Sequence, residues 1–360
     1  MRNSNTIQSY VYLLASLFLF SLARAAEPQL VIVDNDFNGP PNTLSNLRAA
    51  LMFLESSEVK VLGFTVVTGD GWRDEEVAHT LKLLEIAGFK DIPVVPGAVL
   101  PLVNSQEETE AWEMLYGSVG YKGAFNSRMA PDKIPLLPEG MPAGRPADSF
   151  APIFMIQQVH AHPHEVSIFA GGPLTNLAIT LRLDPEFPKL VKELVFMGAL
   201  VNLQPPDFNI RFDPEAAHIV LTAPWPSITS VGEVTSSPNT KAQAILSEEV
   251  VKKLRATNSP IAKYVLEYSQ VDLDDNNNFP LWDELAAAVL IDPLVITKSE
   301  DIYLDVDIDH NMDYGRVHAW WDDQHVPHTN KCKVRVVDAI DVSRFKAMFI
   351  KCMSAYPASP

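Results

Sequence analysis

Cysteine is scarce in this sequence, which has only Cys332 and Cys352 among its 360 residues, both close to the C-terminus. Two cysteines placed this way do not make a metal-ligand cluster, and neither has the context of a catalytic nucleophile. In an oxidising compartment the two could pair and tie the last elements together. The sequence also lacks an Asn-x-Ser/Thr sequon, so we expect no N-linked glycan.

Basic residues are few as well, with 28 Lys and Arg against 45 Asp and Glu, which gives a formal net charge of −17 at pH 7. Such an acidic chain is repelled by nucleic acid and by anionic membranes. We therefore expect a small-molecule or protein partner, and no nucleic acid. The sequence leaves a homo-oligomer open.

The first 25 residues have the composition of a secretory signal peptide. Arg2 precedes an apolar run over residues 10–22, and Ala-Arg-Ala at 23–25 fits the usual cleavage signal. The apolar run is short for a transmembrane helix, although an uncleaved anchor is the alternative. Cleavage would remove Arg2 and Arg24 but no acidic residue, so the formal charge would change from −17 to −19. We expect a secreted, extracellular protein with no membrane segment after cleavage.

The rest of the chain alternates between short apolar runs and segments with helical spacing. Leu30–Val33 is apolar throughout, as expected for a parallel strand buried on both faces. The predicted strands are 30–33, 59–67, 92–95, 166–169, 194–197 and 227–231, and the predicted helices are 44–55, 74–87, one around 107–116, one from 174 onward, 214–221 and 282–291. This alternation predicts an α/β fold with an open, mostly parallel, Rossmann-like sheet flanked by helices, in one domain over residues 26–360.

Acidic and amide residues collect where the predicted strands end. Asp34, Asp36 and Asn38 follow the first strand and Asp70 the second, while Asn209 comes soon after a later one. Ligands of open parallel sheets bind at the carboxyl ends of the strands. Oxygen donors with almost no Lys or Arg fit a hard cation and a polyhydroxylated substrate, and they do not fit a phosphate. For any one of these residues the alternative is a turn or a helix cap.

Three longer segments resemble the inosine-uridine-preferring nucleoside hydrolase family. They are GGPLTNLAITLRLDP at 171–185, followed by VFMGA at 195–199, then DFNIRFDPEAAHIVL at 207–221, and LWDELAAAVLIDP at 281–293. The similarity extends from about Leu30 to Phe345. It implies hydrolysis of the N-glycosidic bond of ribonucleosides, small molecules that are split into ribose and a free base. It also implies a calcium ion, Ca²⁺, that binds the ribose hydroxyls and the attacking water.

The resemblance assigns the metal ligands of this chain. Asp34 and Asp36 match the first two aspartates of the family's opening motif D-x-D-x-G-x-D-D, and Asp36 is the implied catalytic base. Asp283 matches the metal-binding aspartate of the H/W-D-A-L-A helix. The main-chain oxygen of Gly171 falls where the family uses a carbonyl on the metal.

The resemblance also assigns sugar contacts. Asp70 and Asn209 match residues that hold the ribose, and Asn202 is the counterpart of a further sugar-binding asparagine. Asp207 stands in place of a glutamate, so its reach is one methylene shorter.

The opening motif departs from the family pattern. If residues 39–43 are an insertion, Ser45 and Asn46 occupy the positions of the aspartate pair. Asn46 still offers an oxygen to calcium, but without charge, so the affinity should fall.

The base preference rests on two tryptophans. Trp282 precedes Asp283, at a position where some family members have histidine. The tryptophan here resembles the purine-selective branch, in which indoles stack on the base. Trp112 is a candidate second stacking face. Packing is the alternative for each. We expect a metal-assisted hydrolase with a purine preference. The alternatives are a catalytically impaired nucleoside- or sugar-binding protein on this fold, and a hydrolase of another N-glycoside.

Overall fold

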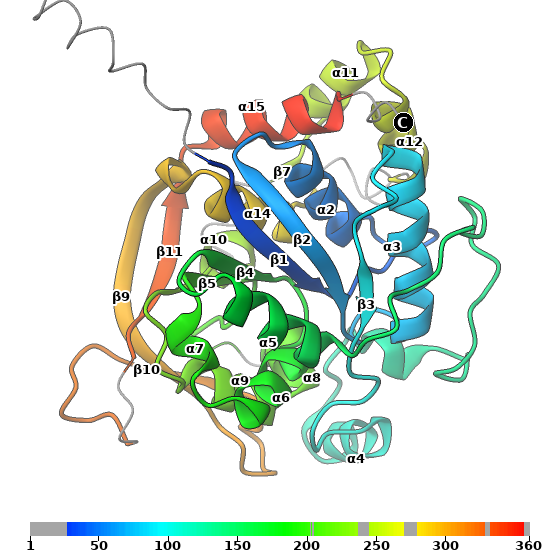
Figure 1. The fold of residues 1–360 in the computed structure, drawn as a ribbon. Helices are drawn as coiled ribbons and strands as arrows, with labels where there is room; N and C mark the ends of the chain where they lie inside the picture. The colour runs from blue at the N-terminus through cyan, green and yellow to red at the C-terminus, as the bar shows by residue number, and fades with distance from the viewer. Residues whose placement is uncertain are drawn as a thin grey trace, which may run out of the picture.

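The computed structural model describes residues 27–201, 203, 205–236, 245–269, 279–327 and 332–355, and its core is one long twisted sheet (Figure 1). In these residues the sheet has nine strands in the order β10-β9-β11-β6-β5-β4-β1-β2-β3. Seven neighbouring strands of this order, β11-β6-β5-β4-β1-β2-β3, pair in parallel. Strand β9 pairs antiparallel with both β11 and β10. The predicted α/β fold with a mostly parallel sheet is confirmed.

The bounds of the strands lie close to those predicted for the first six. They are β1 Gln29–Asn35, β2 Val59–Val66, β3 Val94–Pro96, β4 Val166–Ala170, β5 Glu193–Phe196, β6 Ile228–Ser230, β9 Ile296–Val306, β10 Val317–Trp320 and β11 Val334–Ile340. A separate short pair consists of β7 Ile245–Leu246 and β8 Phe279–Pro280.

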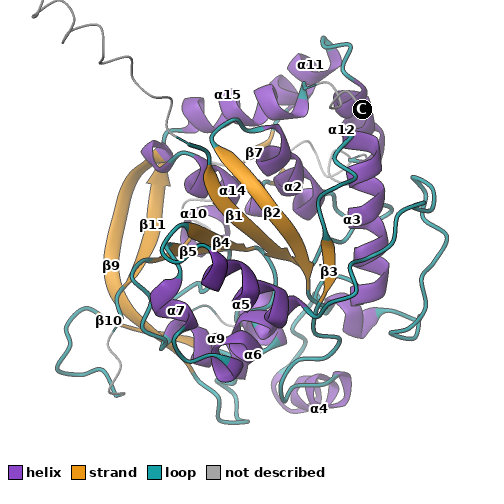
Figure 2. Cartoon of the chain, in the orientation of Figure 1, coloured by secondary structure: helices purple, strands orange, loops and turns teal. Residues whose placement is uncertain are grey.

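Helices cover both faces of the sheet (Figure 2). One layer consists of α2 Ser45–Glu55, α3 Arg73–Ala87, α11 Glu248–Arg255, α12 Pro260–Tyr268, α14 Trp282–Ile291 and α15 Val342–Met353. The opposite layer consists of α5 Ala151–Ala161, α6 Thr175–Leu183, α7 Phe187–Leu190 and α9 Pro214–Leu221. Short helices lie at the strand ends, namely α8 Phe208–Phe212, α10 Gly232–Ser236, η1 Gly123–Asn126 and η3 Pro293–Val295, and α4 Gln106–Tyr116 projects from the body (Figure 1).

Strand β1 explains why its sequence is apolar without alternation. Val31 and Val33 pack into the α2/α14 layer, and Ile32 packs into the α5/α6 layer. Because successive side chains of a strand point to opposite faces, both faces of β1 are buried. The same alternation continues to the strand end, where Asn35 contacts α14 and Asp34 contacts α6.

Local signals set the ends of several helices. Helix α3 carries acidic residues in its first turn, which favour the positive end of the helix dipole, and it stops at Gly88 with a left-handed φ of 82°. Helix α9 starts with Pro214. Asp213 is its N-cap residue, whose side chain accepts a hydrogen bond from the main-chain nitrogen of Ala216.

The C-terminal strands and the longer helices α5, α11, α12 and α15 were not predicted. The first half of β9 is exposed and shows no alternation of buried and exposed residues, so it lacks the usual strand signal. Its partner β11 is distant in sequence.

The two cysteines are free. The Cys352 thiol is buried in α15 and points to the main-chain oxygen of Met52 in α2, whereas Cys332 lies beside the main-chain oxygen of Trp225 in the other layer. The disulfide considered from the sequence is therefore absent. Among the described residues no helix is long and apolar enough to cross a membrane, and the predicted signal peptide lies outside those residues.

Candidate active site

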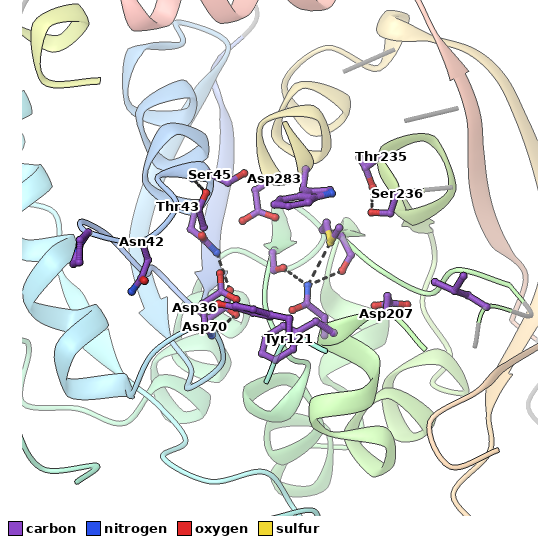
Figure 3. Close-up of a pocket in the computed structure, with 18 residues that line it drawn as sticks. Asp36, Asn42, Thr43, Ser45, Asp70, Tyr121, Asp207, Thr235, Ser236 and Asp283 are labelled. Carbon is purple, nitrogen blue, oxygen red and sulfur yellow. Dashed lines mark hydrogen bonds between the residues drawn. The ribbon is translucent and has the colours of Figure 1, made fainter. Parts of the chain in front are cut away.

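A cavity of about 650 Å³ opens at the carboxyl ends of the parallel strands (Figure 3). Its wall draws on the segments that follow β1, β2, β4 and β5 and on the first turns of α2 and α14. The lining residues are Asp36, Pro41, Asn42, Thr43, Ser45, Asn46, Asp70, Tyr121, Gly171, Met197, Leu203, Asp207, Phe208, Asn209, Thr235, Ser236, Trp282 and Asp283. None of these described lining residues is lysine, arginine or histidine.

Asp36 is buried in the cavity wall and held on both carboxylate oxygens. Its Oδ1 accepts a hydrogen bond from Asn46 Nδ2 at 2.9 Å, and its Oδ2 accepts one from the Asp70 main-chain nitrogen at 2.9 Å. A Cβ added at Gly172 would lie 2.7 Å from Asp36 Oδ1, and one at Gly69 would lie 2.1 Å from its Oδ2. Glycine at both positions therefore leaves the space that this carboxylate occupies.

Three carboxylates make this end of the cavity strongly acidic (Figure 3). Burial, together with the charges of Asp70 and Asp283, raises the pKa of Asp36 well above its usual value. Burial also raises the pKa of Asp283, although a hydrogen bond from Asn35 Nδ2 at 3.0 Å opposes this. The pKa of Asp70 rises to about 6 for the same main reason. Among the described lining residues, this negative charge has no basic partner.

The first turn of α2 closes the wall next to Asp36. Asn46 uses its Nδ2 as a donor, while its buried Oδ1 has no hydrogen-bond partner within the described part of the chain. Ser45 lines the cavity and donates its hydroxyl to Glu284 Oε2 at 2.6 Å. Arg48, fully buried one turn further on, forms an ion pair with Glu284.

Two further residues assigned to the sugar, Asp207 and Asn209, also line the cavity. Asp207 caps α8 by accepting from the main-chain nitrogen of Ile210 at 3.3 Å, and it also accepts from that of Leu200 at 3.1 Å. Burial raises the pKa of Asp207 to about 6. Asn209 Nδ2 donates to the main-chain oxygen of Gly171 at 2.6 Å. Asn202 lies outside the described residues.

Two assigned residues do not reach the cavity. Asp34 Oδ1 accepts from Thr65 Oγ1 at 2.6 Å and from Asn176 Nδ2 at 2.8 Å, so this carboxylate joins β1 to β2 and α6 behind the wall. Trp112 donates its indole N–H to the main-chain oxygen of Asn311 at 2.8 Å and does not line the cavity. The indole N–H of Trp112, which belongs to α4, therefore points to the loop before β10.

An aromatic side of the cavity was not foreseen, apart from Trp282. Tyr121 and Phe208 meet edge to face with ring centroids 5.0 Å apart. The Tyr121 hydroxyl donates to Asp70, and the Tyr121 main-chain oxygen accepts from Arg211 Nη2 at 2.6 Å. A long connection delivers Tyr121, and nothing in its local sequence signals this position.

A cation at this site would rest on few charged ligands. Among the described residues, no group of three or more His, Cys, Asp or Glu side chains could hold a metal ion by itself. Two carboxylates, Asp36 and Asp283, share the cavity with neutral oxygens of Asn46 and Gly171. The unpartnered Asn46 Oδ1 and the uncompensated carboxylates fit a hard cation bound by oxygen.

Comparisons with known proteins agree on one family. Residues 31–347 match the family model described as inosine-uridine preferring nucleoside hydrolase. The chain is 32% identical to a probable uridine nucleosidase 2 of Arabidopsis thaliana, over 68% of this chain and 70% of that protein. It is 26% identical to an inosine-uridine preferring nucleoside hydrolase of Leishmania major, over 82% of this chain and 90% of that protein.

Solved structures give the same result for the fold. A plant nucleoside hydrolase has a TM-score of 0.72 at 25% identity, with 91% of this chain and 99% of that chain covered. A purine-preferring ribonucleoside hydrolase from Gardnerella vaginalis has a TM-score of 0.71 at 21% identity, with 91% and 98% covered, which shows the shared fold alone.

Proposed function

Because the chain belongs to the inosine-uridine preferring nucleoside hydrolase family, we propose that it hydrolyses the N-glycosidic bond of ribonucleosides to ribose and free base. The observation that carries this proposal is the placement of Asp36. It lies buried in the wall of a cavity that combines carboxylates with the aromatic rings of Tyr121, Phe208 and Trp282. The carboxylates suit the polar sugar of a nucleoside, and the aromatic rings suit its flat base.

The reaction needs a proton acceptor and an environment that stabilises positive charge on the sugar. Water attacks C1′, the C1′–N bond breaks with its electron pair on the base, and one water proton passes to Asp36. The departing base takes up a proton from solvent, and Asp36 later releases its proton to solvent, so the products are ribose and the neutral base. The raised pKa of Asp36 suits an acceptor that must hold this proton. Buried carboxylates of Asp70, Asp207 and Asp283 line the same cavity, and on this proposal they would favour an oxocarbenium-like transition state.

We propose calcium as the cofactor, held by Asp36, Asp283, the Asn46 amide oxygen and the main-chain oxygen of Gly171. When bound, such a cation polarises water and orients sugar hydroxyls. The oxygen-only donor set and the unpartnered Asn46 Oδ1 support this choice. Isothermal titration calorimetry with CaCl₂ and MgCl₂ after EDTA treatment tests it, and equal or absent heats for both salts contradict it.

We propose a preference for purine nucleosides, supported by the Trp282 indole and the Tyr121–Phe208 pair on the cavity wall. A fused purine ring offers more area for stacking on these rings than a pyrimidine. The relatives named above include a probable uridine nucleosidase, so the comparison of substrates is decisive. Base release from inosine, guanosine, uridine and cytidine should be measured with calcium present, and a higher kcat/KM for the pyrimidines contradicts the preference.

Asp36→Asn tests the activity itself, because an amide cannot take the proton of water while its size is unchanged. We expect base release to fall by about a thousandfold or more, with nucleoside binding retained. If the wild-type chain binds nucleosides but cleaves none, it is a binding protein on this fold.

We also propose that the protein is secreted, on the strength of the leader sequence in residues 1–25. N-terminal sequencing of protein from the culture medium should begin at Ala26, and retention of Met1 would contradict cleavage.

A further inference from the structure

A second cavity, about 480 Å³, lies at the C-terminal ends of α2 and α14, where α15 packs against both helices (Figure 1). The first turns of α2 and α14 line the active-site cavity, whereas their last residues, Glu55 and Ile291, line this one. Helix α2 has 11 residues and is therefore roughly 16 Å long, so the two cavities are separate. The second cavity has the size of sites that bind small organic molecules.

One carboxylate oxygen in this second cavity lacks a partner. Glu55 is half-buried, and its buried Oε1 accepts no hydrogen bond within the described part of the chain. Burial raises the pKa of Glu55 to about 7, with no opposing contribution from a basic side chain among the described residues. Such an oxygen is costly, because the hydrogen bonds that it makes in water are not replaced. A ligand that brings a donor and a positive charge would remove this cost.

The ends of the two helices add to the negative potential of the cavity. The C-terminal end of a helix carries about half a negative charge, which a basic residue in the last turn usually offsets. Neither α2 nor α14 has a basic residue there, and acidic residues, Glu55 and Asp292, stand at the two ends. The Asp292 carboxylate accepts a hydrogen bond from Arg344 Nε of α15. Among the described residues, Glu55 Oε1 has no such donor.

The other lining residues favour an organic ammonium over a metal ion or an anion. In the described ranges, no group of three or more His, Cys, Asp or Glu side chains could hold a metal ion. An anion would meet Glu55, while the Arg344 guanidinium is already engaged by Asp292. Lys351 also lines the cavity, but it is exposed, so solvent screens its charge. Apolar side chains, including Met348, offer a surface to a short hydrocarbon.

We propose that this cavity binds a small organic amine, whose ammonium group donates a hydrogen bond to Glu55 Oε1 beside the end of α2. The hydrocarbon part of the ligand lies against Ile291 and Met348. This site is distinct from the active-site cavity, and the inference does not depend on the proposed hydrolysis.

Ligand-detected NMR titrations with n-butylamine, n-butanol and butyrate test this assignment, because the three probes share a hydrocarbon chain and differ in the head group. At about pH 8 the amine and the Glu55 carboxyl are both charged. The wild type should bind the amine at least about tenfold more tightly than the alcohol or the acid. Glu55→Gln keeps the size of the side chain and removes its charge, so amine binding should weaken by at least about tenfold.

Glu58→Gln is the matched control, because Glu58 lines the same cavity but is exposed. Its amine affinity should stay within about threefold of the wild-type value. Asp36→Asn is a second control, since the active-site cavity is also acidic, and it should leave amine affinity unchanged. The inference is overturned if the wild type does not prefer the amine, if Glu55→Gln binds it equally well, or if either control loses binding. Base release is measured separately, and its absence refutes the proposed hydrolysis alone.

Discussion

Asn46→Asp should strengthen calcium binding and weaken the calcium-free protein. In the wild type, Asn46 Nδ2 donates to Asp36 Oδ1 at 2.9 Å. An aspartate here would place two carboxylates in contact, and two like charges about 3 Å apart repel by roughly 5 kcal/mol at an effective dielectric constant of about 20. Small rearrangements relieve part of this, so we expect a loss of about 1–3 kcal/mol in free energy of unfolding in EDTA.

With a divalent cation bound, the Asn46→Asp substitution should stabilise the protein instead of destabilising it. The added carboxylate then becomes a third charged ligand beside Asp36 and Asp283, and charge count is a main determinant of calcium affinity. We expect Kd for calcium to fall by about 10- to 100-fold, which corresponds to about 1.4–2.8 kcal/mol. Calorimetric titration gives Kd, and thermal melts in EDTA and in excess calcium give the two stabilities.

Asn176→Asp is the matched control for this prediction. Asn176 is also buried and donates to an aspartate, Asp34 Oδ1, at 2.8 Å, but this contact lies behind the cavity. It should lose stability in the same way without any gain in calcium affinity. If Asn46→Asp binds calcium no more tightly than the wild type, or if Asn176→Asp gains as much, the assignment of the ligand set is wrong.

Three further predictions concern the base, the catalytic carboxylate and pH. Trp282→Ala should raise KM for inosine by about tenfold and for uridine by less, and steady-state kinetics with both nucleosides would show an equal rise if the indole only packs. Gly172→Ala should lower kcat by at least about tenfold, because its Cβ would lie 2.7 Å from Asp36 Oδ1 and 2.8 Å from the Asp36 main-chain nitrogen; an unchanged kcat would mean that the Asp36 position is not critical. The hydrogen bond from His218 to Asp305 raises the pKa of the histidine. The stability it adds is full below the unfolded pKa of about 6.5 and is lost as pH rises through the higher folded value. His218→Gln should remove less than about 1 kcal/mol, discounted for partial exposure, in urea melts at about pH 5.5 and nothing at about pH 9, and equal losses at both would contradict this reasoning.

Much of the fold follows from local patterns in the sequence. The helices at Pro214–Leu221 and Trp282–Ile291 begin and end at the predicted residues, because proline and cap residues mark their ends. The rule that ligands bind at strand ends correctly indicates where Asp36, Asp70 and Asn209 gather. Both signals depend on neighbours within a few residues.

The placement of other site residues depends on contacts that are distant in sequence. At the end of β1 the side chains alternate, so Asn35 faces Asp283 while Asp34 faces Asn176. Sequence matching cannot separate these two faces. Tyr121 lies in a long connection, and its main-chain oxygen accepts a hydrogen bond from Arg211, which is 90 residues later in the chain. Glu284 accepts a hydrogen bond from Ser45, more than two hundred residues earlier in the chain.

The acidic wall without basic residues has a consequence for the choice among related metabolites. A nucleoside 5′-phosphate carries up to two negative charges, and the cavity offers it carboxylates at Asp36, Asp70, Asp207 and Asp283 and no cation among its described lining residues. On the proposed function, this repulsion would disfavour nucleotides relative to neutral nucleosides, even with one divalent cation on Asp36 and Asp283. A reaction that removes the phosphate would then have to precede the use of a nucleotide as a source of substrate.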